Sequence, residues 1–79
     1  MPDPLKVLQD TIASGEASPH ITVEDDPLSD KRRYVLIHGS TDLMAPWFDP
    51  DLVDVGTMRS HLITITGYAR RKKTSLYGS

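Results

Sequence analysis

Four consecutive basic residues near the C-terminal end, with a tyrosine on either side, form the feature best suited to a specific chemistry. The cations are Arg70, Arg71, Lys72 and Lys73, and the flanking rings are Tyr68 and Tyr77. Lysine and arginine neutralise backbone phosphates, and aromatic rings offer faces on which bases stack. The segment therefore predicts binding of a polyanion, with nucleic acid as the first expectation.

Two further interpretations of this basic segment are open at the level of sequence. Consecutive cations also occur on solvated edge strands or turns, where they deter the pairing of a further strand. Alternatively, they dock on an acidic protein surface, including that of a second copy of the chain, which would give a homo-oligomer. Residues 68–79 are accordingly expected to form an edge strand or a tail.

Charge is unevenly distributed along the chain. Residues 59–79 contain five basic and no acidic residues, whereas residues 1–58 contain four basic and all eleven acidic residues, a balance of 4 − 11 = −7. The net charge of −2 conceals this asymmetry. Such a difference between the two parts of a chain indicates an interaction surface without identifying the partner.

A second cluster combines aromatic and acidic residues and suggests protein binding as the alternative function. It consists of Asp42, Trp47, Phe48, Asp49 and Asp51. Exposed rings give a large contact area at a small entropic cost, and the surrounding carboxylates favour a basic host protein. In that case the protein is an inhibitor or adaptor. A third alternative is a self-assembling structural subunit held together by opposite charges.

The segment from Tyr34 to Pro46, YVLIHGSTDLMAP, has an enzymatic counterpart. It resembles the strand and loop that carry the catalytic acid in the α/β-hydrolase family, and the resemblance implies that Asp42 is that acid. The chain contains no Gly-x-Ser-x-Gly nucleophile elbow, and 79 residues cannot build the parallel sheet of that family. We therefore expect no catalytic residue and a protein that is not an enzyme.

The three histidines, His20, His38 and His61, lie beside predicted strands. Their spacing matches no zinc-binding pattern, and a chain without cysteine has no thiolate ligand. We expect no metal site and no cofactor.

Local signals predict a helix and two strands in the first half of the chain. Asp3 and Pro4 are typical of a helix start, and the apolar spacing that follows predicts a helix over residues 4–14. Alternation of apolar and polar residues predicts a strand over 20–24, and an apolar, β-branched run predicts a central strand over 33–38. Residues 39–46 are a loop by composition.

The second half is predicted to contain a short helix and one or two further strands. Asp49 and Pro50 repeat the helix-start signal, so a turn or two of helix is expected before Gly56. Residues 61–68 alternate and predict the clearest strand, and residues 74–77 predict a fourth. The expected fold is one α+β domain over residues 1–79, with a small, mainly antiparallel sheet of three to four strands, an N-terminal helix on one face and a short second helix.

Size and composition agree with a small cytoplasmic binding module. A chain of 79 residues buries only roughly 60–65% of its unfolded surface, so its own core is thin. The lack of cysteine fits a reducing compartment. No basic and apolar leader begins the sequence, and no apolar run approaches the ~20 residues of a membrane span, so we expect a cytoplasmic location without membrane contact.

Overall fold

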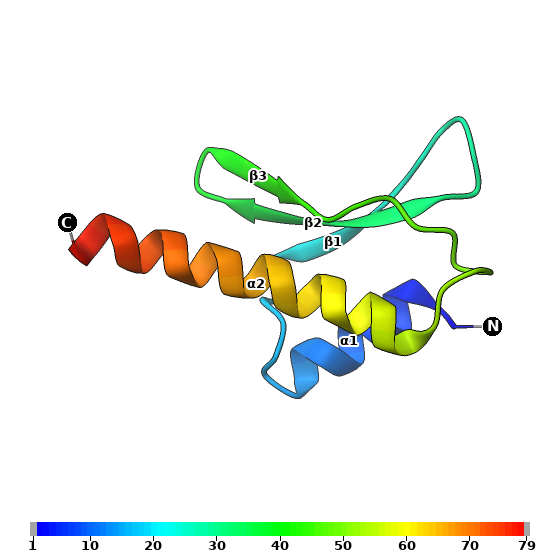
Figure 1. Cartoon of the computed structure of the whole chain (residues 1–79), viewed down its shortest axis with the longest axis horizontal. Helices are drawn as coiled ribbons and strands as arrows, with labels where there is room; N and C mark the ends of the chain where they lie inside the picture. Colours follow the sequence, from blue (N-terminus) through cyan, green and yellow to red (C-terminus); the bar gives the residue numbers. More distant parts are fainter. Residues whose placement is uncertain (1, 79) are drawn as a thin grey trace.

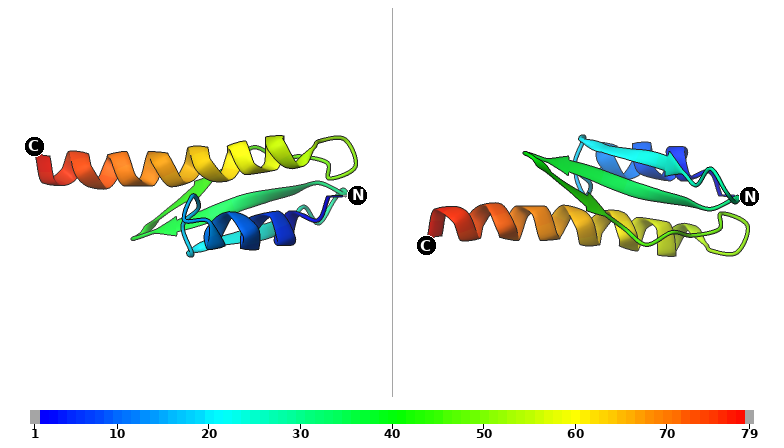
Figure 2. Two further views of the ribbon diagram at one scale, coloured as in Figure 1. Left: turned by 90° about the horizontal axis from the view of Figure 1, so that it is seen from below. Right: turned by 90° about the horizontal axis from the view of Figure 1, so that it is seen from above.

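The computed structural model, which describes the backbone of residues 2–78 and the side chains of residues 2–71, has two layers. Its elements are α1 (Pro4–Ala13), β1 (Ile21–Asp25), β2 (Arg32–His38), β3 (Thr41–Met44) and α2 (Val55–Gly78). The strands form one antiparallel sheet in the order β1-β2-β3. Both helices lie side by side on the same face of this sheet (Figures 1 and 2). The predicted α+β fold with an N-terminal helix is thereby confirmed.

The core lies between the sheet and the helix pair. From the sheet side it receives Ile21, Tyr34 and Leu36, together with Phe48 from the segment after β3. The helices contribute Val7, Leu8, Met58, Leu62, Ile65 and Ala69. Because neither helix has another apolar layer to pack on, the sheet and the helices depend on each other for burial.

Helix α1 begins and ends where the sequence signals lie. The Asp3 carboxylate accepts a hydrogen bond from the Leu5 N–H at 3.0 Å, and Pro4 occupies the first turn. The chain turns away at Gly15, whose φ of 83° lies in the left-handed region that favours glycine. The helix predicted over residues 4–14 is therefore confirmed to within one residue at its end.

Strands β1 and β2 match their predictions, whereas β3 was missed. Residues 39–46 were predicted to be a loop, but a two-residue turn at Gly39 (φ 65°) reverses the chain and pairs Thr41 with His38. Position 39 allows this turn because glycine readily adopts a positive φ. The segment that resembles a hydrolase strand and loop is thus an antiparallel hairpin, and exposed Asp42 lies on its short edge strand.

The second half of the chain differs most from expectation. The strands predicted over residues 61–68 and 74–77 are wrong, because both stretches belong to the 24-residue helix α2. The second helix is therefore long, and the short helix predicted before Gly56 is a turn instead. Helix α2 starts after Asp54, whose carboxylate accepts from the Thr57 N–H at 2.8 Å; this bond lowers the pKa of Asp54. The edge strand or tail expected over residues 68–79 is helical up to Gly78.

The burial pattern explains why these residues are helical. The buried positions of the described part of α2 are Met58, Leu62, Ile65, Thr66 and Ala69. Their spacing of three and four residues is that of one helical face, whereas an alternating strand would have buried every second residue. Packing of this face against α1 and the sheet prevails over the strand propensity of the isoleucines and threonines.

Tyr34 connects α1 to the sheet. Its ring is fully buried, and its hydroxyl donates a hydrogen bond to the Pro4 carbonyl at 2.9 Å. Burial, with a smaller contribution from the Asp3 carboxylate, raises the pKa of Tyr34 to about 12.

This buried hydroxyl makes stability sensitive to alkaline pH. The unfolded chain loses the proton near its ordinary pKa of about 10, whereas the folded chain retains it up to about 12. The contribution of Tyr34 to the free energy of unfolding should therefore be fully present below about pH 10 and be lost as the pH rises towards 12. Urea denaturation of the wild type and Tyr34→Phe over this range measures it. Identical alkaline profiles would contradict the assignment, since the variant keeps the other two tyrosines.

Candidate polyanion-binding site

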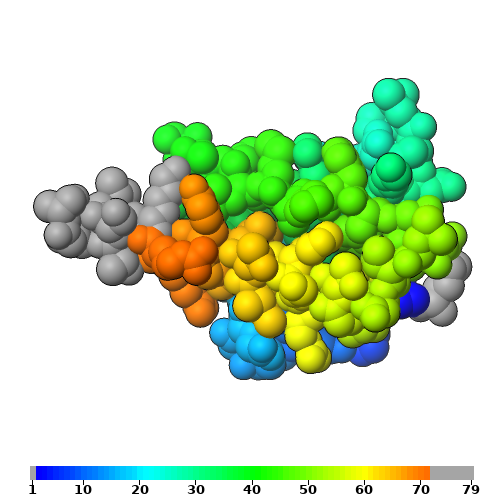
Figure 3. All heavy atoms as spheres, viewed as in Figure 1, coloured from blue at the N-terminus to red at the C-terminus, as the bar shows by residue number. Residues whose placement is uncertain are grey.

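The basic residues of the C-terminal part of the chain all lie on α2. This helix contains Arg59, Arg70, Arg71, Lys72 and Lys73 and has no acidic residue. Figure 1 shows its C-terminal end extending past the β2–β3 turn, and in Figure 3 the orange surface around residue 70 lies at the opposite end of the molecule from the loop after β1. The positive charge is thus concentrated on one helix that leaves the body of the domain.

The helix rearranges the predicted binding face. Tyr68 and Arg70 were expected to share one face of a strand, but residues two apart on a helix point about 200° apart. Both side chains are exposed, and they line different cavities on opposite flanks of α2. Arg71 lies one turn from Gly67, with its guanidinium Nη1 3.5 Å from where a Cβ of residue 67 would be. The side chains of Lys72, Lys73 and Tyr77 lie outside the described residues.

Arg70 lines a cleft that we call the arginine–histidine cleft. It has a volume of about 470 Å³ and is lined by Ser18, Pro19, His20, Leu36, Ile37, His38, Gly39, Thr66, Ala69 and Arg70. None of these lining residues is acidic. The cleft therefore joins one permanent cation to two imidazoles without an opposing carboxylate on its walls.

Hydrogen bonds hold the walls of this cleft in place. The Ser18 N–H donates to the Thr66 hydroxyl oxygen at 3.1 Å, which fastens the loop before β1 to α2 one turn from Arg70. The His20 N–H donates to the Ser18 hydroxyl oxygen at 3.2 Å. On the remaining side, His38 ends β2 at the tight turn of Gly39. Three segments distant in sequence thus meet at one cleft.

The role of the histidines in this cleft was missed at the level of sequence. They were examined as metal ligands, and within residues 2–71 no group of His, Cys, Asp and Glu side chains is arranged to hold a metal ion. Antiparallel pairing was the usable signal, because it places the start of one strand beside the end of the next. His20 precedes β1 and His38 ends β2, so the pairing of these strands brings them to the same end of the sheet.

Tyr68 lines a second, apolar cavity between β3 and α2. This groove has a volume of about 350 Å³ and is lined by Leu43, Met44, Ala45, Pro46, His61, Thr64, Ile65 and Tyr68. The His61 Nδ1 atom is buried there without a hydrogen-bond partner, and burial lowers the pKa of this imidazole. His61 is therefore a neutral packing partner of Phe48, with 5.8 Å between the ring centroids.

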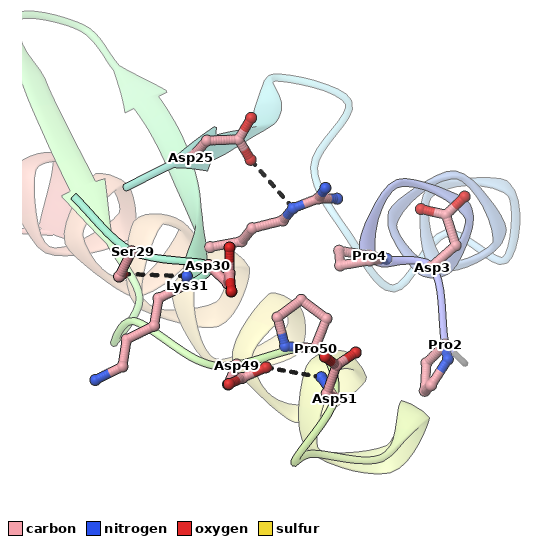
Figure 4. A pocket seen from close by; sticks show the side chains of 11 residues that line it. Pro2, Asp3, Pro4, Asp25, Ser29, Asp30, Lys31, Asp49, Pro50 and Asp51 are labelled. Carbon is pink, nitrogen blue, oxygen red and sulfur yellow. Dashed lines mark hydrogen bonds and ion pairs between the residues drawn. The ribbon is translucent and has the colours of Figure 1, made fainter. Parts of the chain in front are cut away.

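The acidic residues of the alternative site do not surround the aromatic pair. Asp49 and Asp51 line a cleft of about 560 Å³ with Asp3, Asp25 and Asp30, far along the chain from Asp42 on β3 (Figure 4). Within this aspartate cleft, Asp25 pairs with the Arg32 guanidinium at 3.1 Å and Asp49 accepts from the Asp51 N–H at 2.9 Å. The predicted protein-binding cluster is thus divided between two places.

The aromatic pair itself is also divided. Phe48 is only 4% exposed and packs on Tyr34, with the ring centroids 5.5 Å apart, so it belongs to the core and cannot anchor a partner. Trp47 is 36% exposed, and the Arg33 guanidinium carbon lies 4.1 Å from its ring centroid. Arg33 is in turn ion-paired with Glu24. The prediction of two exposed rings is therefore wrong for Phe48.

No family model matches the sequence. Comparisons with curated proteins and with solved structures also give no significant match. Of the helices in the described part of the chain, none has the length and apolar character needed to cross a membrane. The chemistry of the clefts on either flank of α2 is accordingly the basis for a functional assignment.

Proposed function

We propose that this protein is a small non-enzymatic binding module that holds a polyanion, nucleic acid first, along the C-terminal part of α2. Arg70, Arg71, Lys72 and Lys73 contact phosphates, while Tyr68 and Tyr77 pack against bases or sugars. The observation that carries the proposal is a 24-residue helix with five basic residues and no acidic one. The lack of cysteine is compatible with a cytoplasmic setting.

The chemistry of α2 favours binding that does not depend on base sequence. Asparagine and glutamine, which read adenine in the major groove, are absent from this helix. Its cations are suited to backbone phosphates, and binding to phosphates releases counterions. We therefore expect affinity to fall steeply with salt and to differ little between sequences.

Removal of two charges from α2 tests the proposal. Arg70→Ala/Arg71→Ala is expected to weaken binding of a labelled oligonucleotide and, if both arginines contact a single strand, to reduce the slope of log affinity against log salt by up to about 1.4. Alanine is the best helix former, so the substitution preserves α2. Fluorescence anisotropy at several salt concentrations measures both quantities.

A matched variant controls for overall charge. Lys6→Ala/Lys31→Ala also removes two exposed cations, but from the part of the chain that contains the acidic residues. We expect its affinity and salt slope to be close to those of the wild type. Equal losses in the two double variants would reduce the effect to net charge and contradict a site on α2.

The second candidate is an inhibitor or adaptor that binds a basic host protein. It is favoured by the five carboxylates of the aspartate cleft and by Trp47, Ile37 and Met44, which are partly exposed on the sheet face away from the helices. Under this alternative, Asp49→Asn/Asp51→Asn loses the partner while Arg70→Ala/Arg71→Ala retains it. Self-assembly through opposite charges would instead require both pairs, because acidic and basic surfaces then meet.

A further inference from the structure

We propose that the arginine–histidine cleft is a subsite for one phosphodiester group of a single-stranded nucleic acid, held by Arg70, His20 and His38. This inference rests on the proposed function and specifies where on the protein the strand is bound. It extends the site beyond the run of cations on α2 to residues on two other elements, the loop before β1 and the end of β2.

The composition of the cleft suits a phosphate. Arginine binds phosphate oxygens with two parallel N–H groups, and an imidazole N–H supplies a further donor. No carboxylate lines the cleft to repel the anion, in contrast to the aspartate cleft, which contains five. Phosphate is therefore the group for which these three side chains are complementary in charge and in hydrogen bonding.

The position and shape of the cleft favour a nucleotide within a strand. Arg70 begins the run of four cations, so a chain bound in the cleft continues directly onto α2. Pro19, Leu36 and exposed Ile37 give part of the wall an apolar character, suited to a sugar or base beside the phosphate. A volume of about 470 Å³ is within the usual range of small-ligand sites and too small for a duplex.

The walls of the cleft are ordered in the absence of ligand. The loop bearing His20 is fixed to α2 by the hydrogen bond between Ser18 and Thr66, and His38 is held in the β2 ladder opposite Thr41. A strand that binds there consequently does not have to order these segments, which reduces the entropic cost of binding.

Histidine NMR provides the test, since the chain contains three histidines and one lies elsewhere. The ring Cε1–Hε1 signals are followed while the full chain is titrated with a short oligothymidylate at low salt. We expect the His20 and His38 signals to shift with the same saturation curve as the anisotropy. The His61 signal, from the groove on the opposite flank of α2, is the internal control and should shift much less.

A variant supplies an independent measurement. His20→Gln/His38→Gln is expected to weaken oligothymidylate binding by roughly two- to tenfold per lost hydrogen bond, and circular dichroism verifies that the variant is folded. Unchanged affinity, or saturation without shifts of His20 and His38, would overturn the subsite and leave the proposed function intact. Failure of the wild type to bind at low salt would overturn both. Duplex DNA that shifts the same signals equally would overturn the assignment to a single strand.

Discussion

Replacement of Leu62 by alanine is expected to lower the free energy of unfolding by about 2–5 kcal/mol. The side chain is 0% exposed and lies at the centre of the face with which α2 packs on the sheet. Its truncation removes buried apolar surface and leaves a cavity that the surrounding residues fill only in part. Since small domains have total stabilities of about 0.05–0.15 kcal/mol per residue, the loss is a large fraction of the whole. Urea denaturation measures it through the midpoint.

The next residue on the helix is the matched control. Ile63 is 41% exposed, so Ile63→Ala should cost well under half as much as Leu62→Ala. Both variants remove aliphatic carbon from adjacent positions and introduce the same strong helix former. Similar losses at the two positions would contradict the orientation of α2 about its axis.

Replacement of Phe48 by alanine is the second large effect, with an expected cost of about 3–5 kcal/mol. The ring is almost wholly buried, and it contacts Tyr34 from the sheet and His61 from α2. It therefore fills the space where the segment after β3 crosses between the two layers. For a domain of this size, each kcal/mol lowers the melting temperature by about 4–8 °C, so a loss of at least about 12 °C is expected in thermal unfolding.

Trp47 is the control for this second prediction. Trp47→Ala gives up a partly exposed ring and its contact with Arg33, a type of interaction that contributes about 0.5–1 kcal/mol at exposed sites. We expect a much smaller decrease in melting temperature than for Phe48→Ala. If both variants melt at the same temperature, the division of the aromatic pair into one core and one surface ring is incorrect.

The first half of the fold was predictable because its signals are local. An acceptor side chain before a proline starts α1, a glycine with positive φ ends it, and β1 and β2 have apolar residues where the sheet faces the helices. Strand β3 has four residues and no alternating pattern of its own. It exists because the turn at Gly39 folds it back on β2, and this pairing depends on a partner strand more than on local sequence.

Helix α2 was mispredicted because its decisive residues lie outside the alternating window. Within residues 61–68 the β-branched residues imitate a strand, and only Met58 before them and Ala69 after them complete the helical face. Asp54, which caps the helix, was identified only as one more acidic residue. A longer window that included the cap and both outer positions would have supported a helix.

The candidate site was predictable in composition but not in arrangement. The basic run is visible in the sequence, and the structure places Arg70 and Arg71 on an exposed part of α2. The participation of His20 and His38 depends on strand pairing and on the bond from Ser18 to Thr66, two residues 48 positions apart. Contacts of such long range follow from the tertiary fold, so no local pattern indicates them.

The hydrogen bond between Ser18 and Thr66 separates two kinds of affinity. The run of cations exists in the unfolded chain as well, so a polyanion that contacts it alone binds both states and has little effect on the folding equilibrium. The arginine–histidine cleft exists only when the loop before β1, the end of β2 and α2 have come together. A strand bound there selects the folded state, and by linkage its concentration raises the melting temperature. Ligand-dependent stabilisation thus reports occupancy of the cleft separately from attraction to the charged helix.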